Sequence, residues 1–365
     1  MATAEKILVR GVNWLGDAVM TTPALQRLRE AKPGAPITLL THGKLADLWR
    51  GHPSLDAVLT FDERDTVFSV ARRLRAERFD LAVVFPNSVR SALEVFLAGI
   101  PQRVGYGRGR SLLLNHALPP RADSVRMHKR SEAEIQQRMA EGVPRETFAA
   151  AAHHVHDYLQ LAGAVGAEPA PLPLLLRVGA DEVSAVRSRF QLEGAEPLFA
   201  LNPGAEYGPA KRWPSDRFVE LAVQLHQRTG CHWVVLGGRG DVSLAAEMVA
   251  QITKRTAPAR VTNVAGETSL RELCALLKAC ALVVTNDTGP MHVAAAVGTP
   301  VAVPFGSTAP ELTGPLGTRC ELVAGEAPCA PCFRRECPID FRCMTGISTE
   351  RMVEAALQAL NPTAP

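Results

Sequence analysis

A polar, glycine-containing turn between two short apolar runs is the feature that most strongly constrains the fold of this chain. Residues 281–284 form the first run, residues 285–292 the turn, and residues 301–303 the second run, which follows a stop signal at Gly298. Strand, turn, helix and strand in this order make a βαβ unit, the repeating element of a parallel sheet. Ligands bind such sheets outside the carboxyl ends of the strands. The turn therefore predicts a binding site together with a fold.

The side chains of this turn are suited to an anion. Pro290 fits the first turn of the following helix, where no backbone N–H is needed, and His292 lies in the same turn. The free N–H groups and the positive end of the helix dipole favour a negatively charged group there. Asp287 or Thr288 can cap the helix. A buried histidine that only packs is the competing interpretation of His292.

A second turn of the same kind opens the chain. Residues 7–9 predict a strand, residues 11–16 a loop and residues 18–30 a helix, with Asp17 at the junction between loop and helix. Positions 17 and 287 are too far apart for one doubly wound sheet. The sequence therefore predicts an α/β protein with two Rossmann-like domains that face each other across a cleft. A purely structural role for both turns is the alternative.

The remaining pattern supports two domains, and the length of 365 residues is comfortable for two. Three prolines between residues 168 and 173 mark a linker. We expect an N-terminal domain over residues 1–170, a C-terminal domain over 171–347, and a helix with a tail over 348–365. Strands are expected at 37–40, 57–60, 81–85, 199–202, 233–236 and 261–264, and helices at 67–77, 91–98, 148–165, 215–229, 242–254, 270–279 and 348–360.

The charge pattern narrows the class of partner. Seven Lys or Arg residues and one acid lie between residues 103 and 130. This segment lacks interleaved aromatic residues and any nucleic-acid-binding motif, so we expect an anionic carbohydrate or a membrane surface, and no nucleic acid. A solvated basic face is the alternative. No signal peptide and no apolar run of about 20 residues is found, which predicts a cytoplasmic protein.

Four of the eight cysteines lie close together: Cys329, Cys332, Cys337 and Cys343. Their number suits a tetrahedral zinc site, although the spacing is tighter than in a zinc ribbon or finger. A reducing cytoplasm argues against disulfides. Structural zinc and reduced, packed thiols both remain open.

Four collinear blocks carry a more specific resemblance. They are residues 13–17 with 21–25, residues 202–205 with 211–214, residues 265–270, and residues 286–292 running on to 308. With these blocks the chain resembles the heptosyltransferases of lipopolysaccharide inner-core synthesis, glycosyltransferase family nine, and within that family the type II enzymes. The resemblance implies the GT-B arrangement of two domains.

The resemblance also implies a reaction. This is the inverting transfer of L-glycero-D-manno-heptose from ADP-heptose to the first heptose of an anionic, lipid-linked lipopolysaccharide precursor. The N-terminal domain would bind the acceptor, the C-terminal domain would bind the ADP-sugar, and the protein would contact the inner membrane peripherally. No cofactor is implied, and the sequence contains no Asp-x-Asp motif for a metal. A family member with another acceptor, of type I or III, and a non-catalytic sugar-nucleotide-binding protein are the alternatives.

The resemblance assigns roles to particular residues. Asp17 is the expected general base, and Lys211 the expected cation for the leaving diphosphate, with Arg212 as its substitute or helper. Asp287 is expected to orient the loop or a sugar hydroxyl. The structural alternatives are a helix cap for Asp17 and a surface lysine for Lys211. The predicted ADP-sugar contacts are Gly16, Asn202, Gly204, Lys211, Asp241, Gly266, Asp287, Thr288, Gly289 and His292, and the predicted acceptor contacts are Trp14, Asn87 and Arg90.

Overall fold

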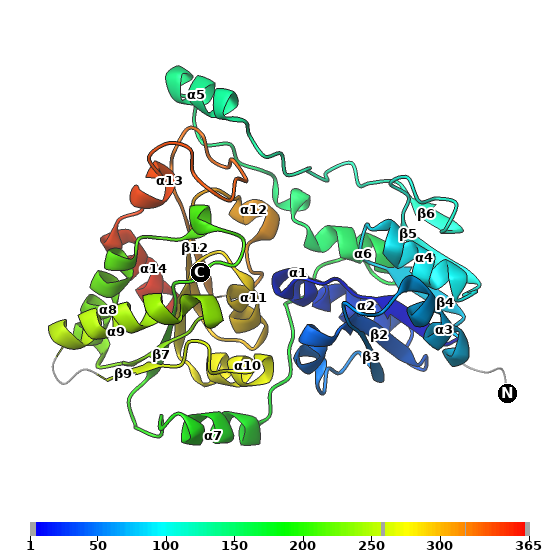
Figure 1. The fold of residues 1–365 in the computed structure, drawn as a ribbon, viewed down its shortest axis with the longest axis horizontal. Helices are drawn as coiled ribbons and strands as arrows, with labels where there is room; N and C mark the ends of the chain where they lie inside the picture. Colours follow the sequence, from blue (N-terminus) through cyan, green and yellow to red (C-terminus); the bar gives the residue numbers. More distant parts are fainter. Residues whose placement is uncertain (1–4, 257–259, 318, 362–365) are drawn as a thin grey trace. The chain divides into compact units, whose positions relative to one another are not determined.

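The computed structural model describes residues 5–256, 260–317 and 319–361, and their packing divides the chain into two compact units (Figure 1). Unit 1 comprises Met1–Ser124 and Ala151–Arg177, and unit 2 comprises Val125–Ala150 and Val178–Pro365. Among the described residues, each unit contains one parallel sheet of six strands. The predicted α/β class with two Rossmann-like domains is thereby confirmed.

The sheet of unit 1 has the strand order β3-β2-β1-β4-β5-β6. The chain starts at β1, builds outward on one side and returns to place β4 on the other side of β1, so the topological switch lies between these two strands. Both central strands are buried along their whole length, as their continuous apolar runs predict. The strands are β1 (Ile7–Arg10), β2 (Ile37–His42), β3 (Ala57–Phe61), β4 (Leu81–Val84), β5 (Gln102–Tyr106) and β6 (His116–Leu118).

The helices of unit 1 differ from the predicted pattern at two places. The expected helix over 18–30 is two helices that meet at Thr21, because Pro23 has no N–H to donate to the carbonyl of Val19, which accepts the Thr22 hydroxyl at 2.8 Å instead. The helical region expected over 148–165 is shorter than predicted. The helical segments are α1 (Leu15–Met20), α2 (Thr22–Ala31), η1 (Gly43–Trp49), α3 (Val67–Glu77), α4 (Val89–Leu97) and α6 (Val155–Gly163), with a short turn η2 (Ala150–Ala152) before α6.

The sheet of unit 2 repeats this topology with the order β12-β11-β10-β7-β8-β9. Its switch point lies between the central strands β7 and β10, whose registers pair Asn202 with Thr285 at their carboxyl ends. The strands are β7 (Leu198–Asn202), β8 (His232–Val235), β9 (Val261–Asn263), β10 (Leu282–Thr285), β11 (Val301–Phe305) and β12 (Cys320–Ala324).

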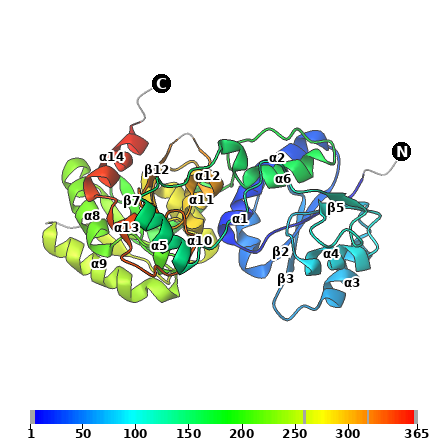
Figure 2. The same cartoon turned by 90° about the horizontal axis from the view of Figure 1, so that it is seen from above.

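Helices cover both faces of this second sheet (Figure 2). Ser269 and Glu272 form the predicted capping box at the start of α10, in which the N–H of Glu272 donates to the Ser269 hydroxyl at 3.2 Å. The helical segments are α5 (Glu132–Glu141), α7 (Ala180–Arg189), η3 (Pro209–Lys211), α8 (Ser215–Thr229), η4 (Arg239–Asp241), α9 (Val242–Arg255), α10 (Leu270–Ala279), α11 (Gly289–Ala296), α12 (Pro310–Thr313), α13 (Arg342–Thr345) and α14 (Thr349–Leu360).

The division by packing departs from the predicted boundaries. Residues 125–150 leave unit 1 and pack on unit 2: the N–H of Arg130 donates to the Cys332 carbonyl at 3.0 Å, and Arg138 Nε donates to the Pro328 carbonyl at 2.9 Å. Figures 1 and 2 both place α5, which lies within residues 125–150, near α13. No local sequence pattern predicts these contacts between segments that lie far apart in the chain.

Two further boundaries also differ from the prediction. Unit 1 extends to Arg177, because residues 170–175 are held by α2; Arg27 Nε, for example, donates to the Ala170 carbonyl at 2.9 Å. Helix α14 packs on α8 and β12 and is part of unit 2.

The capping box predicts a measurable contribution to stability. Ser269→Ala removes the hydroxyl that accepts an otherwise unpaired helix N–H, so we expect the free energy of unfolding to fall by about 1 kcal/mol. Urea titration measures the loss. Ser184→Ala on the exposed face of α7 is the control and is expected to change stability by less than about 0.5 kcal/mol. Equal losses in the two variants would contradict the assignment.

Candidate functional site

The strongest cluster of predicted residues lies at the switch point of unit 2. Asn202 Nδ2, at the end of β7, donates to Thr285 Oγ1, at the end of β10, at 2.9 Å. The next side chain, Asn286, is fully buried and binds two parts of one loop: its Oδ1 accepts from the N–H of Trp213 at 2.9 Å, and its Nδ2 donates to the Pro203 carbonyl at 2.7 Å. The loop over 203–213 is therefore fixed at both ends to the end of β10.

That loop places Lys211 beside the turn with which the sequence analysis began. Lys211 Nζ lies 2.6 Å from Asp287 Oδ2, and the Thr308 hydroxyl donates to the same oxygen at 2.6 Å. Asp287 is only 4% exposed. The carboxylate thus orients the lysine. Sequence reasoning selected Lys211 and Asp287 separately, and the structure joins them as an ion pair.

The first turn of α11 follows directly. Thr288 is the N-cap residue, but its side chain makes no capping hydrogen bond, and Asp287 instead binds Lys211 and Thr308. The partly buried Thr288 and Gly289 are therefore placed to receive an anion at the helix N-terminus. His292 is only 3% exposed. Its burial favours the interpretation as a packed histidine, and its contact with phosphate stays a prediction.

Asp241 lies at the neighbouring strand end. Its Oδ2 accepts from the N–H of Gly238 at 3.1 Å, and its Oδ1 lies 3.5 Å from Arg212 Nη2. A Cβ atom at Gly204 would stand 2.3 Å from Asp241 Oδ2, so any larger residue there would displace this carboxylate. The turn of Gly266 joins the same region through its N–H, which donates to the Gly237 carbonyl at 2.9 Å. The predicted residues Asn202, Gly204, Lys211, Asp241, Gly266, Asp287, Thr288, Gly289 and His292 are thus all at the carboxyl edge of one sheet.

Unit 1 holds the predicted general base. Asp17 lies in the first turn of α1, after Gly16, and is partly buried. Tyr158 of α6 lies close to Asp17. Burial raises the pKa of the Tyr158 phenol well above its usual value, and the negative charge of Asp17 raises it further. Trp14 is 63% exposed, with Lys44 Nζ 5.6 Å from the centre of its ring. An indole this exposed contributes little to the core, and the role of Trp14 in acceptor binding stays a prediction.

A buried ion-pair network supports the loop before Asp17, and sequence reasoning missed it. Arg10 Nε donates to Glu94 Oε2 at 2.9 Å, with these side chains 3% and 0% exposed. Arg10 Nη1 also donates to the Gly11 carbonyl at 2.6 Å. Glu94 accepts a second bond, at 2.9 Å, from Nε of Arg90. Because Arg10 ends β1 and Glu94 follows β4, the network lies at the switch point of unit 1.

The network also changes the interpretation of the predicted acceptor contacts. Arg90 is 41% exposed, but it is partly engaged by Glu94 and by the Asp65 carbonyl, to which its Nη2 donates at 2.6 Å. Asn87 is exposed, and its Oδ1 accepts from Arg110 Nη2 at 3.4 Å. Both residues lie at the carboxyl edge of the sheet, as predicted, and a role in acceptor binding stays a prediction.

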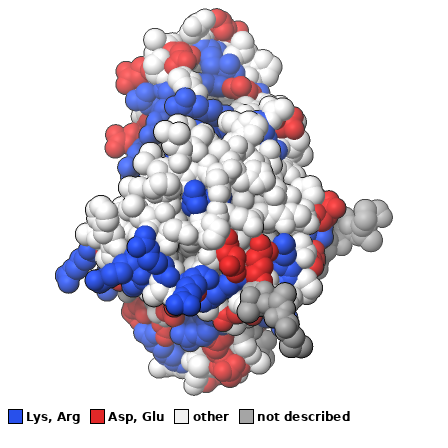
Figure 3. Space-filling model, turned by 90° about the vertical axis from the view of Figure 1, so that its right-hand side faces the viewer, with Lys and Arg blue, Asp and Glu red and all other residues white. Residues whose placement is uncertain are grey.

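The expected basic surface over residues 103–130 is not formed as predicted. Arg110 and Arg130 are only 2% and 7% exposed, and residues 125–130 belong to unit 2. On the face drawn in Figure 3, Lys and Arg side chains form separate groups, interrupted by acids and by uncharged surface. Four of the seven basic residues bind backbone carbonyls or an internal acid, namely Arg103, Arg110, Arg121 and Arg130.

The four clustered cysteines are free thiols in the structure. Burial raises the pKa of Cys329 and Cys332, and raises that of Cys343 to about 12, with a further increase from the neighbouring thiols. These thiols are therefore protonated near neutral pH. Across the described ranges, no group of three or more His, Cys, Asp or Glu side chains is arranged to hold a metal ion. Zinc binding by these cysteines stays a prediction.

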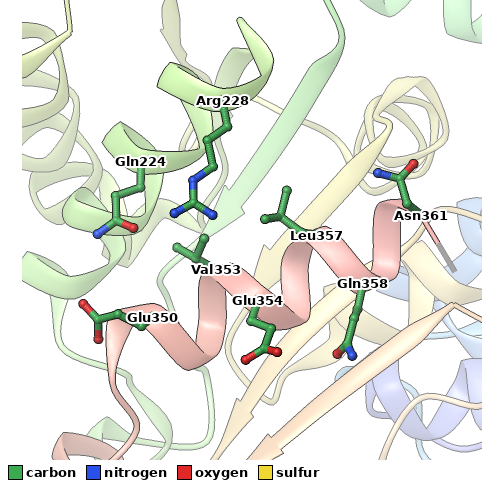
Figure 4. Close-up of a pocket in the computed structure, with 8 residues that line it drawn as sticks. All are labelled: Gln224, Arg228, Glu350, Val353, Glu354, Leu357, Gln358 and Asn361. Carbon is green, nitrogen blue, oxygen red and sulfur yellow. The ribbon is translucent and has the colours of Figure 1, made fainter. Parts of the chain in front are cut away.

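A groove of about 340 Å³ on unit 2 lies elsewhere. It is lined by α8 and α14, including Arg228, Glu350 and Glu354 (Figure 4). None of its lining residues belongs to the predicted site. Its Gln224 and Arg228 come from the second half of α8, away from the helix start that follows the Lys211 loop.

The comparisons with known proteins agree with this arrangement. Residues 67–140 and 136–341 match glycosyltransferase family 9 (heptosyltransferase). The chain is 33% identical to lipopolysaccharide heptosyltransferase 2 of Escherichia coli (strain K12), over 87% of each chain, and 30% identical to lipooligosaccharide heptosyltransferase 2 of Haemophilus influenzae, over 87% of this chain and 88% of that protein. The solved structure of E. coli ADP-heptose lps heptosyltransferase II superposes with a TM-score of 0.75 at 31% identity, over 97% of this chain and 98% of that one.

The chain therefore belongs to glycosyltransferase family 9. Its fold matches the GT-B structure of that relative. Within the described residues, no helix is both long and apolar enough to cross a membrane.

The buried network of unit 1 predicts a large effect of one substitution. Glu94→Gln leaves the charge of Arg10 uncompensated in the interior, so we expect the free energy of unfolding of unit 1 to fall by about 3 kcal/mol or more. The matched control is Glu30→Gln, which removes a pair whose carboxylate side chain is 55% exposed, and its cost is expected to stay below about 1 kcal/mol. Chemical denaturation of both variants measures the difference. A Glu94→Gln protein as stable as the control would refute the proposed importance of the network.

Proposed function

We propose that the protein transfers L-glycero-D-manno-heptose from ADP-heptose to the first heptose of the lipopolysaccharide inner core, with inversion at the anomeric carbon. The observation that carries the proposal is the Lys211–Asp287 pair at the N-terminus of α11, in a chain of this family. The names of its relatives support ADP-heptose as the donor and a type II lipopolysaccharide heptosyltransferase as the class of enzyme.

The donor half of the proposed reaction belongs to unit 2. The diphosphate of the ADP-sugar would bind the N–H groups of Thr288 and Gly289, with Lys211 beside them. As the bond between the anomeric carbon and the phosphate oxygen breaks, negative charge grows on the leaving ADP. A cation already oriented by Asp287 stabilises that charge without reorganisation. Asp241, near the glycine turns after β7 and β8, would accept from a ribose hydroxyl.

The acceptor half belongs to unit 1. Asp17 would take the proton from the acceptor hydroxyl as that oxygen attacks the anomeric carbon, which inverts the configuration in one displacement. The exposed ring of Trp14 would stack on the acceptor heptose, and Asn87 and Arg90 would bind its hydroxyl or phosphate groups. The acceptor is lipid-linked, so the protein would work at the cytoplasmic face of the inner membrane. We expect transfer to need no metal ion.

Asp17→Asn tests the base. It keeps the shape of the side chain but removes its proton affinity, so we expect turnover to fall by roughly 10²-fold or more while ADP binding is retained. Asp47→Asn, at an exposed position of unit 1, is the control. Steady-state rates and calorimetry with ADP provide the two measurements. Near-normal turnover in a folded Asp17→Asn protein would remove Asp17 from the mechanism.

Lys211→Ala tests the diphosphate site. We expect ADP binding to weaken by about tenfold or more and transfer to slow as well, because the lost cation acts on a charge that grows during the reaction. The double variant Lys211→Ala/Asp287→Asn should recover part of the binding, since the remaining carboxylate no longer repels the phosphates. Lys254→Ala, an exposed lysine of the same unit, is the control. Unchanged binding and rate in Lys211→Ala would move the assignment to Arg212.

The acceptor can be tested with two precursors. We expect activity on a precursor that bears one heptose and little on a precursor that bears none. Trp14→Ala should raise KM for the acceptor and leave ADP affinity unchanged, whereas Phe68→Ala, a control at another exposed aromatic residue of unit 1, should change neither. Efficient transfer to the heptose-free precursor would overturn the type II assignment and leave the family assignment intact.

A further inference from the structure

The cysteine-rich segment, residues 329–343, is in direct contact with the loop that carries Lys211. The N–H of Ala210 donates to the Arg335 carbonyl at 2.9 Å, and Arg335 Nε donates to the Tyr207 carbonyl at 2.6 Å. The Tyr207 hydroxyl donates to the Phe333 carbonyl at 2.8 Å. Three hydrogen bonds therefore tie the two segments together within unit 2.

The approach of the two segments depends on Gly208. Its φ of +153° lies outside the conformations that other residues favour, and a Cβ atom there would stand 2.6 Å from the Arg335 carbonyl oxygen. The sequence thus provides a glycine at the point where the segment carrying Arg335 meets the Lys211 loop. The contact is a specific feature of the fold and fixes the backbone of Arg335.

The same contact places two cations around one aromatic ring. Lys211 Nζ lies 5.1 Å from the centre of the Tyr207 ring, and Arg335 Cζ lies 5.7 Å from it. The two charges differ in their surroundings. Lys211 is paired with Asp287 at 2.6 Å, whereas the exposed guanidinium of Arg335 forms no ion pair with any residue that the structure describes.

A diphosphate at the proposed donor site therefore needs more positive charge than Lys211 supplies. A diphosphate carries more than one negative charge, and the charge of Lys211 is already balanced by Asp287. A guanidinium presents several N–H donors in a fork that fits phosphate oxygens, and it keeps its charge at all relevant pH values. With Nε bound to the Tyr207 carbonyl, the two terminal nitrogens of Arg335 remain to meet a ligand.

We propose that Arg335 is a second phosphate-binding cation of the donor site, delivered to the Lys211 loop by the cysteine-rich segment. The proposal rests on the proposed function and deepens it, because it assigns a ligand contact to a segment that the reaction otherwise leaves unused. Tyr207 acts as the spacer that holds the two cations apart while it is attracted to both.

Calorimetry with ADP and NMR titration with adenosine, which lacks phosphate, test the assignment. In Arg335→Ala we expect ADP affinity to fall by about tenfold or more, the scale of one charge-assisted hydrogen bond, and adenosine affinity to stay within about twofold. Arg335→Lys should show an intermediate loss. Arg342→Ala is the matched control, since Arg342 belongs to the same segment but pairs with Asp340, and it should change neither affinity.

Each result separates this proposal from the proposed function. Unchanged ADP affinity in Arg335→Ala, beside a wild-type protein that binds ADP, would overturn the role of Arg335 alone. Equal losses for ADP and adenosine would show that the substitution disturbs the loop, and would also overturn the phosphate contact. A wild-type protein that binds no ADP would overturn the proposed function, and the role of Arg335 with it.

Discussion

The buried amide of Asn286 is the contact on which the geometry of the proposed donor site depends. It binds the backbone at both ends of the loop over 203–213, through Pro203 and Trp213, and has no exposed surface. Removing one partner of a buried hydrogen bond leaves the other without water to replace it, which makes the arrangement costly to break. The indole of Trp213 extends the anchor, because its Nε1 donates to the Ile347 carbonyl at 3.0 Å. A rigid loop then presents Lys211 to Asp287.

The two units use different side chains to bind the polar strand ends at the switch points of their sheets. In each sheet the order in which strands are added reverses at the central pair of parallel strands, and the strand ends there leave polar groups that need partners. Unit 2 satisfies them with neutral amides and hydroxyls, beside the N-terminus of α11 that we propose as the anion site. Unit 1 uses the buried pair of Arg10 and Glu94, whose guanidinium also holds the loop before Asp17. We infer that this division matches a division of labour between phosphate binding and proton transfer.

Local patterns in the sequence were sufficient for the regular parts of the fold. The central strands are continuous apolar runs, and the helix over 270–279 carries its own capping box, so each can be recognised without knowledge of its partners. Strands β5 and β6 were not predicted, because β5 begins with Gln102 and Arg103 and contains Gly105. The position of β5 is set by its pairing with β4, and that of β6 by its pairing with β5.

The site was predictable in its residue types but not in its pairings. The turn with Asp287 indicated an anion site, yet nothing local shows that Asp287 orients Lys211 or that Glu94 pairs with Arg10. The basic run over 103–130 does not form the expected basic surface for the same reason. A count of charges does not reveal which side chains bind carbonyls inside the fold. The sequence did not indicate a role for Arg335, because its hydrogen-bond partners lie more than 120 positions earlier in the chain.

We propose above all that the ends of β7 and β10 form a diphosphate site built around Lys211 and Asp287. Hydrogen–deuterium exchange with and without saturating ADP tests it most directly. We predict slower exchange in residues 203–213 and 286–292 when ADP is bound, with little change in residues 86–97 of unit 1. Protection confined to unit 1, or absent from both segments of unit 2 in a protein that binds ADP, would contradict the account.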